Sequence, residues 1–543
     1  MRTLLVVIWL TLGSTGPAVV GPPGATPLAP RDSALHVLNR LAYGPRPGEV
    51  DRVAANGVMR WIETQLQPER IPNDRLALRE RTYPIEQFTQ QDLARMSAEA
   101  QAERKEQRLA GDTMGGSRRM DGDQVPSVET DLRQLIAQQQ QLAVVRAALS
   151  ERQLEEVMVD FWTNHFNVFL GKGADRFLLP SYIEHTIRPN ALGRFEDLLV
   201  ATAQSPAMMF YLDNWESVAP GSTPPAPPRA RRQRRGWLLE NPRPNAARQQ
   251  PRGINENYAR ELLELHTLGV DGGYTQQDVI AVARILTGWS IERPNAGGEF
   301  VFHDWAHDRG EKTVMEVRYP AGHGQDEGLK LLHWLAEQHA TMHHVSAKLC
   351  ARFVADDPPD GCVDAAVDAW ERSHGDIREV LRAIFTTPEF WSPRAIHGKV
   401  KTPLEFVISA VRAVAADPDS SGRLAQVVGR LGEPLYQHVA PDGYPEREDA
   451  WVNSGSLLER MNVAVGLAAG RLPGITLDLD SLVPTTTDHA ALIATVNARL
   501  LNGQMTEHTR QVLRDQLADV TDPAQARTLA VGLALGGPEF QRQ

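Results

Sequence analysis

The chain has 543 residues, of which 42% are hydrophobic and 23% are charged, the balance of an ordinary globular protein with a sizeable core. Its formal net charge of −11 argues against a general nucleic-acid binder, whose affinity depends on many Lys and Arg contacts with phosphates. We therefore expect no nucleic-acid partner.

The N-terminus carries the pattern of an export signal. Arg2 precedes an apolar run over residues 4–12, which has the length of a signal-peptide core. This run is too short to span a bilayer by itself, because a spanning helix needs about 20 apolar residues. Residues 1–25 are therefore predicted to be a signal peptide or an uncleaved N-terminal anchor. The protein is expected to be periplasmic or secreted, with membrane contact only through an uncleaved signal segment.

Residues 30–543 show mostly helical periodicity and little strand alternation, which predicts one large, mainly α domain built of helical hairpins. Two polar breaks, at 110–127 and 219–253, are predicted to be mobile insertions. The second contains eight arginines, so a polyanion-binding patch is the alternative. The first helices are expected over 33–41, 49–66, 86–107 and 129–150.

A helix predicted over residues 154–169 carries two distinct stripes. Asp160, Asn164 and Asn167 share a polar stripe, whereas His165 lies on the apolar face. His165 is either a core histidine satisfied by one partner, or a ligand or general base held in a dry pocket. Further along, Pro180 suits a first helical turn. Glu184 and His185 point about 100° apart and are expected to lie at the surface.

Residues 255–278 combine carboxylates, an arginine and a histidine in a predicted helical hairpin. Asn255 is expected to cap the first helix, and Thr275 with Asp278 to form a capping box for the second, over 276–288. Asn257, Glu261 and Glu264 share one face, and His266 lies on the apolar side. These residues could bind a divalent metal, although no Glu-x-x-His motif is present. The alternative is a polar layer of salt bridges, including an Arg260–Glu264 pair.

Residues 300–320 lose the helical pattern, and a small irregular or hairpin segment is expected there. His307 and Asp308 in this segment could ligate a metal, or could be solvated loop residues. Further along, His339, His343 and His344 are expected to be exposed near the start of a helix. Cys350 and Cys362 are the only cysteines, and they could close a disulfide or remain free thiols.

Several segments together resemble one family. They include 36–45 (HVLNRLAYGP), 160–169 (DFWTNHFNVF), 255–289, 307–314 (HDRGEKTV), 348–354 (KLCARFV), 401–406 (KTPLEF) and 451–462. The sequence is similar to the domain-of-unknown-function 1800 family of bacterial proteins, which often carry an export signal. The segment 441–445 (PDGYP) departs from that pattern, because a glycine–tryptophan pair is more typical there. The resemblance implies a companion role beside exported proteins of sulfatase-like or phosphatase-like fold, and no reaction.

Two functions are open from the sequence. The first is an exported enzyme, hydrolytic or otherwise and assisted by a divalent metal, in which Asp160 and His165 would meet Glu261, Glu264 and His266. In this hypothesis the loop with His307 and Asp308 would lie nearby. The second is a non-catalytic binding or scaffold protein that supports export or maturation of a sulfatase-like partner.

Overall fold

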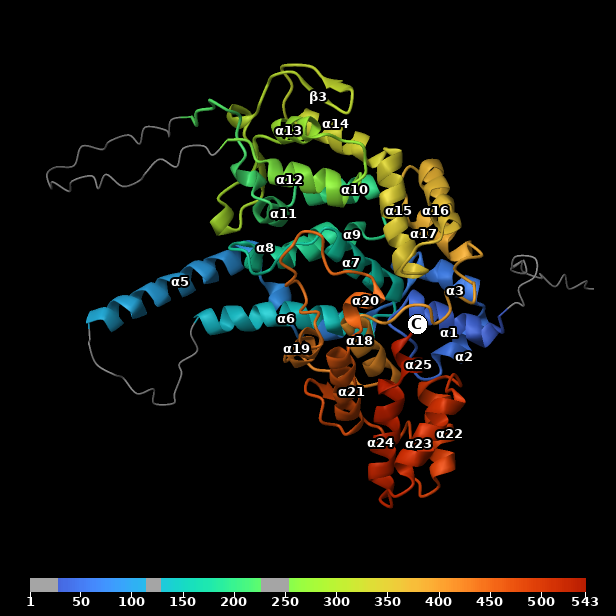
Figure 1. Cartoon of the computed structure of the whole chain (residues 1–543). Coiled ribbons are helices and arrows are strands. Elements are labelled where there is room, and N and C mark those ends of the chain that lie inside the picture. The colour runs from blue at the N-terminus through green and yellow to red at the C-terminus, as the bar shows by residue number, and fades with distance from the viewer. Residues whose placement is uncertain (1–27, 114–127, 226–252) are drawn as a thin grey trace, which may run out of the picture.

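The computed structural model describes residues 28–113, 128–225 and 253–543. Helices dominate these residues, and the strands form three small antiparallel pairs (Figure 1). The predicted mainly α fold class is therefore confirmed. The predicted signal segment lies outside the described residues, as do most of the two predicted insertions.

The chain begins with three short helices rather than two. α1 (Pro30–Arg40) is followed by α2 (Glu49–Asn56) and α3 (Val58–Gln65). The prediction of one helix over 49–66 is wrong, because Gly57 adopts φ 93° and ends α2 before α3 begins. The next elements are η1 (Pro68–Arg70), α4 (Asp74–Glu80) and η2 (Pro84–Gln87).

Two long helices, α5 (Gln90–Thr113) and α6 (Val128–Leu149), form an arm that projects from one side of the molecule in Figure 1. The inner end of α6 is held by buried ion pairs. Arg146 binds the carboxylates of Glu80 at 2.6 Å and of Glu184. The prediction that Glu184 lies at the surface is therefore wrong, because this carboxylate neutralises a buried arginine.

The middle of the chain forms the upper part of the molecule in Figure 1. Pro180 lies inside α8 rather than in a first helical turn, and α8 continues directly into the π-helix η3. The elements are α7 (Gln153–His165), α8 (Asp175–Ser181), η3 (Tyr182–Ile187), α9 (Arg188–Asn190), α10 (Phe195–Ala203), α11 (Pro206–Tyr211), η4 (Asn214–Glu216), α12 (Glu256–Glu261), η5 (Leu262–His266) and α13 (Gln276–Ile285).

The irregular segment contains two hairpins. β1 (Trp289–Ile291) pairs with β2 (Phe300–Phe302), and β3 (Lys312–Val314) pairs with β4 (Val317–Tyr319). Two 3₁₀ turns, η6 (Pro294–Ala296) and η7 (Asp304–Ala306), connect them. The hairpin expected near 300–320 is present as β3–β4.

The remaining helices form two groups in Figure 1, one beside α1–α3 and one at the C-terminal end. In the first group, α14 (Gln325–Ala336) packs against α10 and α13, whereas α15 (His339–Phe353), α16 (Asp360–Ser373) and α17 (Ile377–Thr386) lie nearer to α1–α3. The second is α18 (Pro403–Ala413), α19 (Arg423–Arg430), α20 (Glu448–Trp451), α21 (Ser454–Ala468), α22 (His489–Leu500), α23 (Glu507–Leu517), α24 (Pro523–Gly536) and α25 (Pro538–Gln541), with the strand pair β5 (Asp417–Pro418) and β6 (Ile475–Thr476).

One continuous cluster of buried apolar side chains runs from Ala34 to Phe540 and joins both groups to the middle of the chain. Its largest buried side chains include Trp162, Trp289 and Trp370. Within the described ranges, no helix is long and apolar enough to cross a bilayer.

Candidate active site

A loop of residues 436–447, here named the covering loop, crosses α7 and is fixed to its polar stripe. Asn164 donates from Nδ2 to the carbonyl of Tyr444 at 2.8 Å and accepts from the Tyr444 amide at 2.6 Å. Asn167 donates to the carbonyls of His438 and Ala440 at 3.1 and 2.7 Å. Asn164 and Asn167 of the predicted polar stripe thus pair with backbone groups that are 271–280 positions away in sequence.

Gly443 brings the covering loop into contact with α7. Its φ of 74° is left-handed, and a Cβ at this position would lie 2.3 Å from the carbonyl oxygen of Asn164. Only glycine meets both demands without displacement. The departure seen at 441–445 therefore keeps the glycine and places Tyr444 where the resemblance leads one to expect tryptophan.

Beneath the covering loop lies a cavity of about 40 Å³, lined by Asp160, Arg352, Glu433 and Glu446 among others. Burial raises the pKa of Asp160 to about 7; Arg352 opposes this shift, and the charge of Glu446 adds to it. Burial, together with the nearby Asp160 charge, raises the pKa of Glu433 to about 8. Two carboxyl groups in one cavity therefore exchange protons near neutral pH.

Helix α15 contributes a line of three cationic or ionisable side chains. His344, Lys348 and Arg352 are spaced four residues apart and so lie on one face of the helix. Burial lowers the pKa of Lys348 to about 8, against the charges of Glu446 and Asp442 in the covering loop. Arg352 is buried and forms an ion pair with Glu405. The prediction that His344 is exposed is wrong, because this ring is mostly buried and its Nε2 lies 3.2 Å from the carbonyl of Leu265.

His165 and His266 meet in an apolar pocket next to this line. The Nε2 of His165 donates to the carbonyl of His266 at 3.2 Å, and the two ring centroids are 6.2 Å apart. Among the described residues, Nδ1 of His165 and Nε2 of His266 are buried with no hydrogen-bond partner. Burial and the charge of Lys348 lower both pKa values, that of His266 to about 3, so both rings are neutral at pH 7.

The π-helix η5 explains how His266 reaches this pocket. Because η5 is a π-helix, its turn contains about one more residue than an α-helical turn, and at its end the Thr267 hydroxyl donates to the carbonyl of Leu262 at 2.6 Å. Such single π-turns occur frequently at functional sites. The predicted Asn255 cap is present, with the Asn257 amide donating to its side chain at 2.7 Å. The Thr275–Asp278 capping box is present as well.

Glu261 and Glu264 are half-buried and do not line the cavity. Burial raises the pKa of Glu261, as do the charges of Glu264 and then of Asp442 in the covering loop. Arg260 forms its ion pair with Glu256 at 3.7 Å, so the predicted Arg260–Glu264 pair is not the one observed.

His307 and Asp308 belong to a different cluster. Asp308 binds Arg284 through two bonds of 2.7 and 3.1 Å. His307 donates from Nδ1 to the carbonyl of Thr287 at 2.9 Å, and its Nε2 lies 3.5 Å from Glu327. Both residues thus take part in a buried ionic network that fixes the β3–β4 hairpin on α13.

Cys350 and Cys362 form a disulfide that joins α15 to α16, with Cα atoms 6.2 Å apart. The bond fastens the C-terminal end of α15, which includes Arg352, to the start of α16. In the described parts of the chain, no group of three or more His, Cys, Asp or Glu side chains is placed to hold a metal ion.

Lys348, Arg352, Glu433, Asp442 and Glu446 were not among the residues expected at the site. The spacing of His344, Lys348 and Arg352 on one helix is the signal that could have indicated three of the site residues. No comparable local signal exists for Glu433 or for the covering loop.

The fold and site together define a mainly helical protein with an acid–base cluster closed by one loop. The chain belongs to the family described as protein of unknown function (DUF1800), whose model matches residues 36–542. Neither the curated proteins nor the solved structures include a significant match to it.

Proposed function

We propose that the chain is an enzyme that hydrolyses a polar substrate by acid–base catalysis beneath the covering loop. The observation that carries this proposal concerns Asp160 and Lys348. Within the described residues, neither side chain has a hydrogen bond or an ion pair, although both are largely removed from solvent. Partly buried charges that lack a direct partner lose part of their hydration, and clefts with shifted pKa values are typical of catalytic sites.

The two groups suit complementary roles. With a pKa near 7, Asp160 can take a proton from water as the water oxygen attacks an electrophilic carbon, phosphorus or sulfur. With a pKa near 8, the Lys348 ammonium can stabilise the negative charge that develops on the substrate oxygen, or donate a proton to the leaving group. The charge of Glu446, which lines the same cavity as Asp160, raises the pKa of both groups.

The cavity of about 40 Å³ has room for about one water molecule. A substrate must therefore displace part of the covering loop to reach Asp160. The attachment of that loop through Asn164 and Asn167 makes this a local movement rather than a rearrangement of helices.

The test is a screen of the purified full chain against p-nitrophenyl esters, phosphates, sulfates and glycosides. Turnover should rise with pH as Asp160 deprotonates near pH 7 and fall as Lys348 loses its proton near pH 8. Asp160→Asn and Lys348→Met should each reduce kcat by about 10²-fold or more. Asp271→Asn and Lys330→Met, both exposed, are the matched controls. Equal turnover by wild type and Asp160→Asn, or turnover of none of these substrates, would refute the proposal.

One observation favours a second function, that of a scaffold. The cavity is small, and Val439, which is 68% exposed, gives the covering loop an apolar side chain that a partner can contact. In this case the loop would bind an exported sulfatase-like or phosphatase-like protein. Copurification of such a co-expressed partner should then be lost with Val439→Asp and retained with Asp160→Asn. The enzyme proposal instead predicts that Asp160→Asn is the variant that loses function, measured as turnover.

We also propose that the protein acts in the periplasm or outside the cell. The disulfide between α15 and α16 supports this location, because such bonds persist in oxidising compartments. Fractionation of cells that express the full chain tests it. Recovery with the cytoplasmic fraction, with the cysteines reduced, would contradict it.

A further inference from the structure

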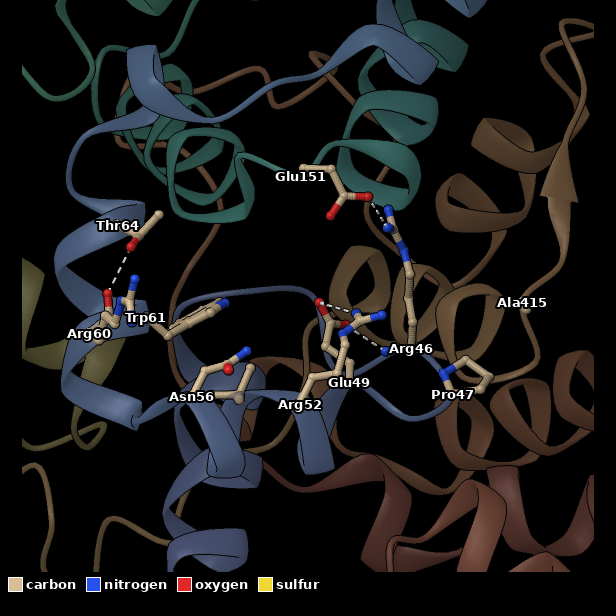
Figure 2. A pocket seen from close by; sticks show the side chains of 11 residues that line it. Arg46, Pro47, Glu49, Arg52, Asn56, Arg60, Trp61, Thr64, Glu151 and Ala415 are labelled. Atoms are coloured by element: carbon tan, nitrogen blue, oxygen red, sulfur yellow. Dashed lines mark hydrogen bonds and ion pairs between the residues drawn. The ribbon is translucent and has the colours of Figure 1, made fainter.

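A second cavity, which shares no lining residue with the candidate active site, lies between α2, α3 and the connection from α6 to α7. It has a volume of about 690 Å³, within the range of small-molecule sites. Figure 2 shows Trp61 on one side of it and the Arg46–Glu151 pair on the other, with Arg52 and Asn56 below.

One wall of this cavity is rigid. Arg46 binds the carboxylate of Glu151 and donates to the carbonyl of Ala148 at 3.0 Å. Glu49 accepts from the Arg46 amide at 2.8 Å and from the buried Arg412 at 3.1 Å. These bonds hold the wall in place before any ligand arrives, which reduces the entropy lost on binding.

The facing side chains have unused hydrogen-bonding groups. Across the described residues, the indole N–H of Trp61, the amide of Asn56 and the guanidinium of Arg60 have no hydrogen-bond or ion-pair partner. Arg52 has only a 3.9 Å contact with Glu49 and is 64% exposed. In Figure 2 the nitrogen of the Trp61 indole and the Asn56 amide both point into the cavity.

We propose that this cavity is a saccharide-binding site, in which a pyranose ring packs on Trp61. A pyranose has a flat face of C–H groups and an edge of hydroxyls that both donate and accept hydrogen bonds. The indole ring matches the apolar face. Asn56, Arg52 and Glu151 offer amide, guanidinium and carboxylate groups, which together match hydroxyls as donors and acceptors.

The charge of the lining supports a neutral ring over a simple anion. Three arginines face two glutamates in the lining, and Glu49 is also paired with Arg412 outside it. The excess of positive charge is therefore small and lies at the exposed rim, on Arg52 and Arg60. A ligand held chiefly by charge would gain little from such a lining, whereas a polyhydroxylated ring can use every group in it.

The test is calorimetric titration of the full chain with maltose, cellobiose, lactose and di-N-acetylchitobiose, and with benzoate as a flat anion without hydroxyls. At least one saccharide should bind, and Trp61→Ala should weaken that binding tenfold or more. Asn56→Ala should weaken it about threefold to tenfold. Asn56 is exposed, so this variant retains the fold even if Trp61→Ala does not.

Trp305→Ala, which removes a half-buried indole elsewhere, is the matched control and should bind as wild type does. No binding of any of the four saccharides, binding by Trp61→Ala and Asn56→Ala as tight as that of wild type, or binding of benzoate alone would each overturn the proposal. None of these outcomes bears on Asp160 or Lys348, so this site and the proposed function are tested independently.

Discussion

Substitution of Gly443 by alanine should release the covering loop from α7 without unfolding the protein. The residue has φ 74°, and a Cβ there would lie 2.3 Å from the carbonyl oxygen of Asn164 and 2.6 Å from its Oδ1. The left-handed backbone costs alanine about 1–2 kcal/mol. The clash should also break the two hydrogen bonds between Asn164 and Tyr444, each of which contributes about 1 kcal/mol.

Gly503→Ala is the matched control, because Gly503 has φ 91° and no atom within 4 Å of a built Cβ. Both variants have the backbone cost, so the difference between their unfolding free energies isolates the clash and the lost bonds, about 2 kcal/mol. Gly503 lies outside the covering loop, so Gly503→Ala should leave the opening of that loop as in wild type. In Gly443→Ala the lost bonds alone correspond to about a 30-fold increase in the population of open loop. Hydrogen exchange of peptides from 436–447 measures that population, and urea unfolding measures global stability. Equal exchange in the two variants would show that the contact with Asn164 does not hold the loop.

Three further predictions concern stability. Arg352→Met should lower the free energy of unfolding by about 3–5 kcal/mol, because it leaves the buried carboxylate of Glu405 without its cationic partner; Arg318→Met, in an exposed pair, should leave it nearly unchanged. The pKa of His266 is lowered to about 3, so the unfolded chain binds a proton that the folded chain does not, and stability should fall as pH decreases from about 6.5 to 3. His266→Phe should flatten that dependence in urea titrations at several pH values, and an unchanged slope would contradict the burial of a neutral ring. Reduction of the α15–α16 disulfide, which closes a loop with a sequence separation of 12, should lower the unfolding free energy by about 3 kcal/mol; a loss below 1 kcal/mol would contradict the loop-entropy argument.

Local signals in the sequence were sufficient for much of the fold. The Asn255 cap and the Thr275–Asp278 capping box involve groups two or three residues apart, so the sequence contains all that is needed to predict them. The polar stripe on α7 was equally visible. Gly57, however, was included in one helix, because a single glycine does not say whether its backbone will be helical or left-handed.

The parts of the site that escaped prediction depend on contacts between distant segments. Asn164 contacts Tyr444 across 280 positions, and the sequence around either residue contains no signal that predicts this contact. The π-turn at Leu262–His266 changes which residues share a face, so a helical wheel drawn with 3.6 residues per turn misplaces His266 relative to Glu261. Lys348 and Arg352 lie on α15, and the sequence predicts that the first histidines of this helix are exposed, so the helix did not suggest a buried site.

His307 and Asp308 illustrate why residue type alone is a weak guide to a metal or catalytic site. The same side chains serve in metal centres and in structural ion clusters, and only their partners distinguish the two. Here Lys312 binds Glu327 at 2.6 Å, and Arg284 binds Asp308, so opposite charges are matched within the cluster. Asp160 and Lys348 differ because, in the described part of the chain, no such partner is present. The absence of a partner around a largely buried charge, rather than the density of His and acidic residues in the sequence, is what favours the cleft beneath the covering loop as the catalytic centre.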